Sequence, residues 1–177
     1  MSRSEFMPDA RLKRLAKEIE ALAEKDDDSI RYAREVSRLR RRAAAELFDV
    51  CAGFVEAVNR LLPNPQVELD PPQYNEELFN EEGPNLIQIN VRGRILQLEF
   101  EATPELISTE DFRIPYTISG AVRAFNQALL DKDLIEEQLL FYTVEKQRTM
   151  WRFFDARTYR SGEFDQGYLV SLMEQLV

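Results

Sequence analysis

Glu99 and Glu101 are the residues whose type and spacing come closest to a catalytic arrangement. Residues two apart on a strand point to the same side, so the two carboxylates could transfer protons or bind Mg²⁺. The pattern also fits the solvated face of an amphipathic strand, paired across the sheet with Arg92, Arg94 or Arg113. We favour this second, structural interpretation.

Histidine is missing from the sequence, and cysteine occurs once, at Cys51. Ser-His-Asp and Cys-His catalysis are therefore excluded, as are zinc sites built from histidine and cysteine. No phosphate loop, dinucleotide fingerprint, nucleophile elbow or EF-hand is present. Cys51 lies in an apolar stripe, which is typical of a small buried side chain. We therefore predict no catalytic residue, no metal and no cofactor, and favour a protein that is not an enzyme.

Aromatic and arginine side chains are concentrated between residues 141 and 168. Trp151 falls on one face of a predicted strand, where we expect it to be buried, and Phe154 falls on the other. Aromatic residues beside arginine are typical of protein-binding surfaces. The alternatives are helices that cover both faces, packing of one of these aromatic residues on the N-terminal helix, or a small-ligand pocket in which arginine binds an anion. The protein-binding candidates are Tyr142, Arg152, Phe154, Arg157 and Arg160.

The elements that position these residues begin with helix. Leu12, Leu15, Ile19 and Leu22 recur at three-four spacing, which predicts a first amphipathic helix. The three aspartates at 26–28 predict a break and the cap of a second helix.

The second helix is predicted over about residues 30–62. Its later half carries a wide apolar stripe that fits a core, whereas residues 30–42 carry a narrow apolar seam beside a basic face. That seam suits a partner helix, which could be residues 9–25 folded back or a second chain. The dimer-seam candidates are Val36, Leu39, Arg38 and Arg42.

An acidic, proline-rich connector follows, with at most a short strand at 66–70. The apolar period then changes to two and predicts a hairpin over 87–100, with Arg92-Gly93 at its turn. A third strand is predicted from Phe112 to Ile118. Residues 120–131 fit either a short helix or a continuing strand with a bulge at Gly120, and we favour the helix.

A second hairpin is predicted to pair residues 138–145 with residues 149–155, and Asp165 can cap a final helix. The fold class is therefore α+β: an antiparallel sheet of about five strands packed against a long N-terminal helix and a C-terminal helix, with an extra N-terminal helix. Residues 1–64 would form the helical segment and residues 65–177 the α+β core, as one structural domain overall. Secretion-chaperone-like α/β folds are similar in topology, although no diagnostic motif supports that analogy.

The net charge of −9 and the pI near 4.7 argue against binding to nucleic acid or to an anionic membrane. No apolar run approaches the roughly 20 residues of a membrane span, and the first residues do not resemble a signal peptide, so we expect a cytoplasmic protein. The favoured function is a non-enzymatic protein-interaction module of bacterial type that forms a homodimer and binds another protein. The alternative is a small-molecule-binding or carboxylate-dependent enzyme domain with a pocket between sheet and helices.

Overall fold

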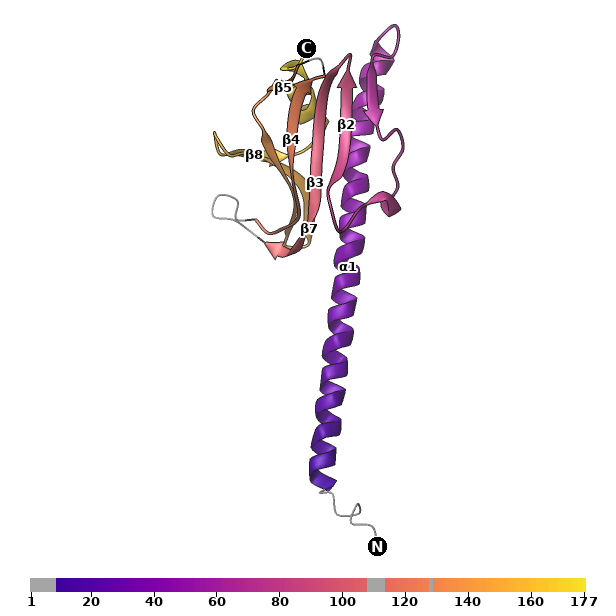
Figure 1. Cartoon of the computed structure of the whole chain (residues 1–177), viewed down its shortest axis with the longest axis vertical. Coiled ribbons are helices and arrows are strands. Elements are labelled where there is room, and N and C mark those ends of the chain that lie inside the picture. The colour runs from indigo at the N-terminus through magenta and orange to yellow at the C-terminus, as the bar shows by residue number, and fades with distance from the viewer. Residues whose placement is uncertain (1–8, 108–113, 128) are drawn as a thin grey trace. The chain divides into compact units, whose positions relative to one another are not determined.

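The computed structural model describes residues 9–107, 114–127 and 129–177 (Figure 1). The chain divides into two compact units, Met1–Arg38 and Leu39–Val177. Helix α1 (Asp9–Leu61) contributes to both units, and all its residues from 9 to 35 are exposed. The second unit contains the sheet, the rest of α1 and the short helix α2 (Gln166–Glu174).

The continuity of α1 corrects one prediction. Residues 26–28 do not end a helix, so the expected extra N-terminal helix is wrong, and residues 9–25 do not fold back on residues 30–42. Aspartate in a helix interior costs only about 0.7 kcal/mol relative to alanine, and neither glycine nor proline interrupts residues 9–52. An ion pair of 3.4 Å between Arg31 and Asp28, one turn apart, adds local support.

The sheet is antiparallel and larger than the predicted five strands. Seven strands of the described residues follow one another in the order β1-β2-β3-β4-β6-β7-β8, and β5 pairs with β4 outside that path. The α+β class, the long N-terminal helix and the C-terminal helix are confirmed. The strands are β1 (Val67–Asp70), β2 (Asn85–Val91), β3 (Arg94–Ile107), β4 (Tyr116–Asn126), β5 (Leu129–Asp133), β6 (Gln138–Glu145), β7 (Arg148–Asp155) and β8 (Arg160–Glu163), with the 3₁₀ helix η2 (Glu76–Leu78) between β1 and β2.

Both predicted hairpins are confirmed. The β2–β3 turn places Arg92 and Gly93 at φ of 52° and 92°, and the β6–β7 turn places Lys146 and Gln147 at 45° and 67°. Two successive positive φ values define the two-residue turn whose twist matches that of antiparallel strands. These turns fix the register, so Tyr142 lies opposite Trp151.

The prediction of a helix over 120–131 is wrong, because β4 continues to Asn126 and β5 follows. Ile118, Val122 and Ala124 alternate into the core with Gly120 between them. Gly120 is required there because an added Cβ would lie 2.2 Å from the carbonyl oxygen of Glu99. Of the residues expected in the third strand, Phe112 lies outside the described part of the chain.

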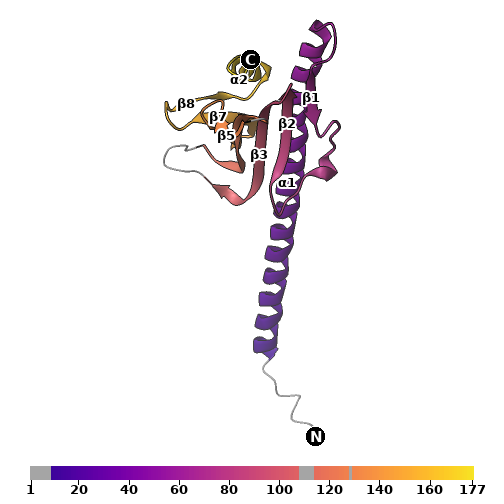
Figure 2. The same ribbon diagram turned by 45° about the horizontal axis from the view of Figure 1, so that its top comes forward.

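The main core lies on one face of the sheet. Within the second unit, α1 from Leu39 onward and α2 both cover this face (Figures 1 and 2). The Arg40 side chain connects α1 to the sheet: its Nε donates to the carbonyl and hydroxyl oxygens of Thr117 at 3.2 and 2.9 Å, and it also donates to the carbonyl oxygen of Thr103. Trp151 is 4% exposed, as predicted.

Candidate functional site

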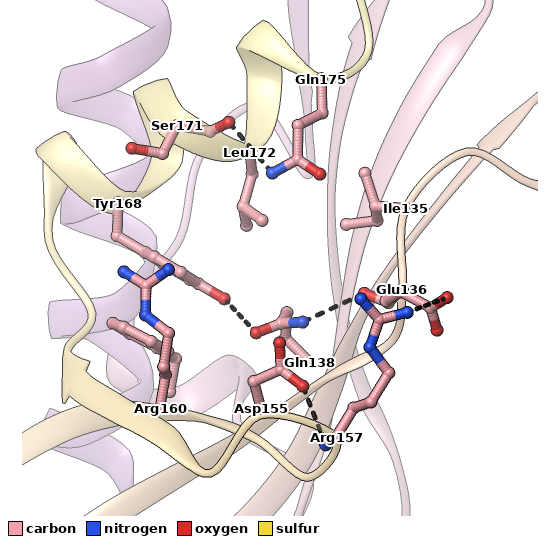
Figure 3. Close-up of a pocket in the computed structure, with 11 residues that line it drawn as sticks. Ile135, Glu136, Gln138, Asp155, Arg157, Arg160, Tyr168, Ser171, Leu172 and Gln175 are labelled. Carbon is pink, nitrogen blue, oxygen red and sulfur yellow. Dashed lines mark hydrogen bonds and ion pairs between the residues drawn. The ribbon is translucent and has the colours of Figure 1, made fainter.

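A cavity of about 240 Å³ lies between α2 and the strands β6 to β8 (Figure 3). Tyr168 and Leu172 point from α2 toward Gln138 of β6, as Figure 3 shows. Asp155 at the end of β7 and Arg160 at the start of β8 line the cavity from the sheet side. Helix α2 is held in place by Asp165, which accepts a 2.8 Å hydrogen bond from the backbone N–H of Tyr168, and by Leu169, Leu172 and Met173 in the core.

Most polar groups around this cavity bind one another. The hydroxyl of Tyr168 donates to Oε1 of Gln138 at 3.2 Å, and Gln138 in turn donates to the carbonyl oxygen of Glu136 at 3.3 Å. The ring of Tyr168 stacks on Phe153 with 3.9 Å between centroids and 3° between planes. The cavity is therefore an ordered pocket with one aromatic wall.

Charge in the cavity is carried mainly by Asp155 and Arg160. Partial burial acts to raise the pKa of the Asp155 carboxyl, but hydrogen bonds from the backbone N–H groups of Arg157 and Thr158 and from Gln138 lower it below its ordinary value. Burial and the nearby charge of Asp155 raise the pKa of the Tyr168 phenol, whereas Arg160 acts in the opposite direction. At neutral pH the cavity thus offers a carboxylate, a neutral phenol and a guanidinium.

The arginines predicted to bind a partner lie in different surroundings. Arg157 is exposed and forms a 3.2 Å ion pair with Glu136 at the cavity rim. Arg160 lines the same cavity and makes no ion pair with any residue that the structure describes. Arg152 is half-buried on the opposite face of β7, where Nη1 lies 3.7 Å from Sδ of Met150 and Nε has no partner among the described residues. Two of the three arginines therefore share one site.

The two aromatic candidates are buried. Tyr142 lies in the main core against Trp151, and its hydroxyl is 3.4 Å from Oε2 of Glu46. Phe154 belongs to a second, smaller cluster with Tyr116 and Phe141, on the sheet face away from α1. Neither ring lies at the surface, so contact with a partner would need the packing around it to open.

Glu99 lies in a shallow groove of about 400 Å³ on that same outer face. Arg123 of β4 donates to Glu137 at 2.6 Å and to Glu99 at 3.3 Å. The hydrogen bond to Glu137 is the main reason that the pKa of the Arg123 guanidinium is raised, although partial burial opposes it. Glu99 is thus paired across the sheet with Arg123. Among the arginines considered as partners from the sequence, Arg113 lies outside the described part of the chain.

The dimer-seam candidates follow consecutive turns of α1. Val36 and Leu39 are half-buried, and Leu39 packs against the main core, whereas Arg38 and Arg42 are exposed. A row of exposed apolar groups lies earlier in α1. Leu12, Leu15, Ile19 and Leu22 are each 46–57% exposed and follow the three-four spacing of one helix face.

Several residues of the cavity carried no signal in the sequence. Gln138, Ser171 and Gln175 are ordinary polar residues, and only the pairing of β6 with β7 and the position of α2 bring them together. Tyr168 stood at the end of an aromatic-rich segment, which was a partial indication. The stripe at 12–22 was visible in the sequence as one side of a separate first helix, which could either fold back on residues 30–42 or leave that seam to a second chain.

No family model, no curated protein and no solved structure matches this chain. Within the described residues, no group of three Asp, Glu or Cys side chains is placed to hold a metal ion. No helix in the same part of the chain combines the length and the apolar character that crossing a membrane requires.

Proposed function

We propose that this chain is a non-enzymatic protein-interaction module that binds a partner helix along the first part of α1. One observation carries the proposal: the apolar stripe of Leu12, Leu15, Ile19 and Leu22, with Ala16 and Ala23 beside it, is exposed along a continuous helix. For clarity we call these six residues the N-terminal stripe.

The energetic argument concerns helix stability. Isolated helices are marginal in water, and most helices in proteins are stabilised by burying an apolar face. Burying a Leu or Ile side chain contributes about 1.5–3 kcal/mol, of which about half is missing while the side chain is half exposed. A second helix on the N-terminal stripe would supply that stabilisation, and the small side chains of Ala16 and Ala23 would allow close approach.

Site-specific photo-crosslinking tests this proposal. A photoreactive amino acid at position 15 should form a covalent adduct with a protein in cells that make the full chain. The matched control places the same amino acid at position 17, which points to the opposite side of the helix. An equal yield of adduct at the two positions, or none at position 15, would overturn the proposal.

A second candidate function, binding of a small charged molecule, is favoured by the cavity beneath α2. Arg160 and the Asp155 carboxylate line it together, so a small zwitterion such as a free amino acid could satisfy both. Titration of the protein with free amino acids, followed by NMR, should then shift the signals of Gln138 and Tyr168, and Arg160→Ala should remove the effect. Absence of any shift at about 10 mM, equivalent to a binding free energy weaker than about −2.7 kcal/mol, would exclude this function.

A further inference from the structure

Charges around the N-terminal stripe are arranged in two blocks. Residues 11–17 contain four basic side chains and no acidic one, whereas residues 18–28 contain six acidic side chains and one lysine. The basic block consists of Arg11, Lys13, Arg14 and Lys17. The acidic block consists of Glu18, Glu20, Glu24, Asp26, Asp27 and Asp28, interrupted by Lys25. All of these side chains are exposed on α1.

We infer that the N-terminal stripe binds the same stripe of a second copy of this chain, with the two helices antiparallel. The inference rests on the proposed function and names its partner. In a parallel pair, basic blocks would face basic blocks and acidic blocks would face acidic blocks. In an antiparallel pair, the basic block of each copy faces the acidic block of the other, so one sequence supplies both complementary surfaces.

The three-four spacing also gives the register. Leu12 and Ile19 occupy one seam position of the seven-residue repeat, and Leu15 and Leu22 occupy the other. In the register that we propose, Ile19 lies opposite Leu22 of the second copy. The two-fold symmetry of the pair then places Leu22 of the first copy opposite Ile19 of the second.

On one flank of the seam, this register brings Glu18 opposite Lys25 of the second copy, twice by symmetry. On the other flank, Ala16 lies opposite Ala23. If the register shifts by one repeat, Leu15 faces Ile19 of the second copy. Glu18 then faces Glu18 of the second copy, and Arg11 faces Lys25 of the second copy, so like charges meet at both positions. The flanking charges therefore select the first register.

Asp26 limits the length of the contact. It follows Leu22 at the next seam position and would lie opposite Leu15 of the second copy, within reach of the basic block there. A carboxylate at a seam position reduces stability but favours one register. We therefore expect a reversible dimer that weakens as salt screens the charge blocks.

Disulfide crosslinking tests the orientation in the full chain. The native Cys51 is buried, and the experiment uses a Cys51→Ala background so that this residue cannot form disulfides. An equimolar mixture of Ile19→Cys and Leu22→Cys chains should form a mixed disulfide dimer in higher yield than either variant alone. Lys17→Cys with Glu24→Cys, on the far side of the helix, is the matched control. Dimers that form within each single variant would indicate a parallel pair and overturn the inference, as would the absence of any disulfide dimer.

Charge reversal tests the register independently. Glu18→Lys and Lys25→Glu should each weaken dimerisation by roughly tenfold, because each replaces two attractive pairs by two repulsive ones. The double variant restores opposite charges at both pairs and should regain most of the wild-type affinity in sedimentation equilibrium. Failure of this rescue would overturn the register.

The outcome of the photo-crosslinking experiment separates the two proposals. An adduct at position 15 with a different protein, together with a monomer in light scattering at tens of micromolar, would retain the interaction function and reject self-pairing. The same adduct with a second copy supports both.

Discussion

The indole Nε1–H of Trp151 donates a hydrogen bond to the carbonyl oxygen of Ala43, with 2.7 Å between nitrogen and oxygen. This contact joins β7 to α1 inside the main core, where Trp151 also packs edge-on against Phe100 at 5.5 Å. A polar group buried this deeply needs a hydrogen-bond partner, and the carbonyl oxygen of Ala43 provides one for the indole N–H of Trp151.

Replacing Trp151 should be strongly destabilising. We expect Trp151→Ala to lower the free energy of unfolding by about 3–5 kcal/mol, because it leaves a cavity between α1 and the sheet. Trp151→Phe keeps an aromatic ring but loses the hydrogen bond and part of the packing, and should cost about 1–3 kcal/mol. Urea unfolding measures both values. A loss below about 1 kcal/mol for the alanine variant would contradict the packing described above.

Two glycines should respond in opposite directions to alanine. An alanine Cβ at position 120 would collide with the backbone of Glu99 and Phe100, so Gly120→Ala should destabilise the protein by about 2 kcal/mol or more. Gly53 lies within α1 with nothing within 4 Å of an added Cβ, and Gly53→Ala should stabilise it by about 1 kcal/mol. Thermal melts of the two variants provide the comparison. Equal effects at the two positions would show that Gly120 is not constrained by the neighbouring strand.

The hydroxyl of Tyr74 is buried without a hydrogen-bond partner among the described residues, while its ring stacks on Phe48 at 5.5 Å. Tyr74→Phe removes the unpaired group and keeps the ring, so we expect no loss and a gain of up to about 1 kcal/mol. Tyr168→Phe is the matched control, because it breaks the hydrogen bond to Gln138 and should cost about 0.5–1.5 kcal/mol. A larger loss for Tyr74→Phe than for Tyr168→Phe would be inconsistent with these environments.

Alkaline pH should lower the free energy of unfolding, because the Cys51 thiol and the Tyr74 hydroxyl are buried in their neutral forms. Burial raises the pKa of the Cys51 thiol from 9.0 to about 12 and that of the Tyr74 phenol from 10.0 to about 12. Between the unfolded and folded pKa values the folded chain retains protons that the unfolded chain releases. The stabilising effect of each neutral group is therefore complete below the unfolded pKa and is lost as pH rises toward about 12.

The measurement is the free energy of unfolding as a function of pH over the alkaline range. We expect it to fall as pH rises, with a smaller slope in Cys51→Ala and in Tyr74→Phe than in the wild type. An unchanged slope in both variants would show that other groups cause the pH dependence. The native protein should also react slowly with thiol reagents at mildly alkaline pH, because the thiolate is the reactive form.

Local patterns in the sequence predicted the elements whose signals are themselves local. Arg92-Gly93 marked the first hairpin turn, and Asp165 marked the start of α2. The second turn was expected at residues 146–148, and the structure narrows it to Lys146 and Gln147 because Arg148 already belongs to β7. The helix expected after Gly120 was wrong: Val122 and Phe125, three residues apart, fit one face of a helix, but in β4 they lie on opposite faces of the strand. Pairing with β3 and β6, contacts distant in sequence, decides between helix and strand.

The sites were less predictable than the fold. Arg157 and Arg160 were identified from composition and do share a cavity, but Gln138 reaches that cavity only through the position of α2. The three aspartates at 26–28 were read as a helix stop because aspartate favours caps, yet nothing in that segment prevents a helix from continuing. That misjudged boundary divided α1 into two helices and left open that residues 9–25 could cover residues 30–42.

The contact between Ala43 and Trp151 also sets the earliest point during synthesis at which this part of the core can form. The two residues are 108 positions apart in the chain. At a translation rate of about 5–20 residues per second, Trp151 is added about 5–20 s after Ala43. Throughout that interval the core-facing side of α1, including Leu47 and Phe54, has no β7 to pack against. The core around Trp151 is therefore completed only late in synthesis, since Leu169 and Leu172 of α2 are added after Trp151 as well.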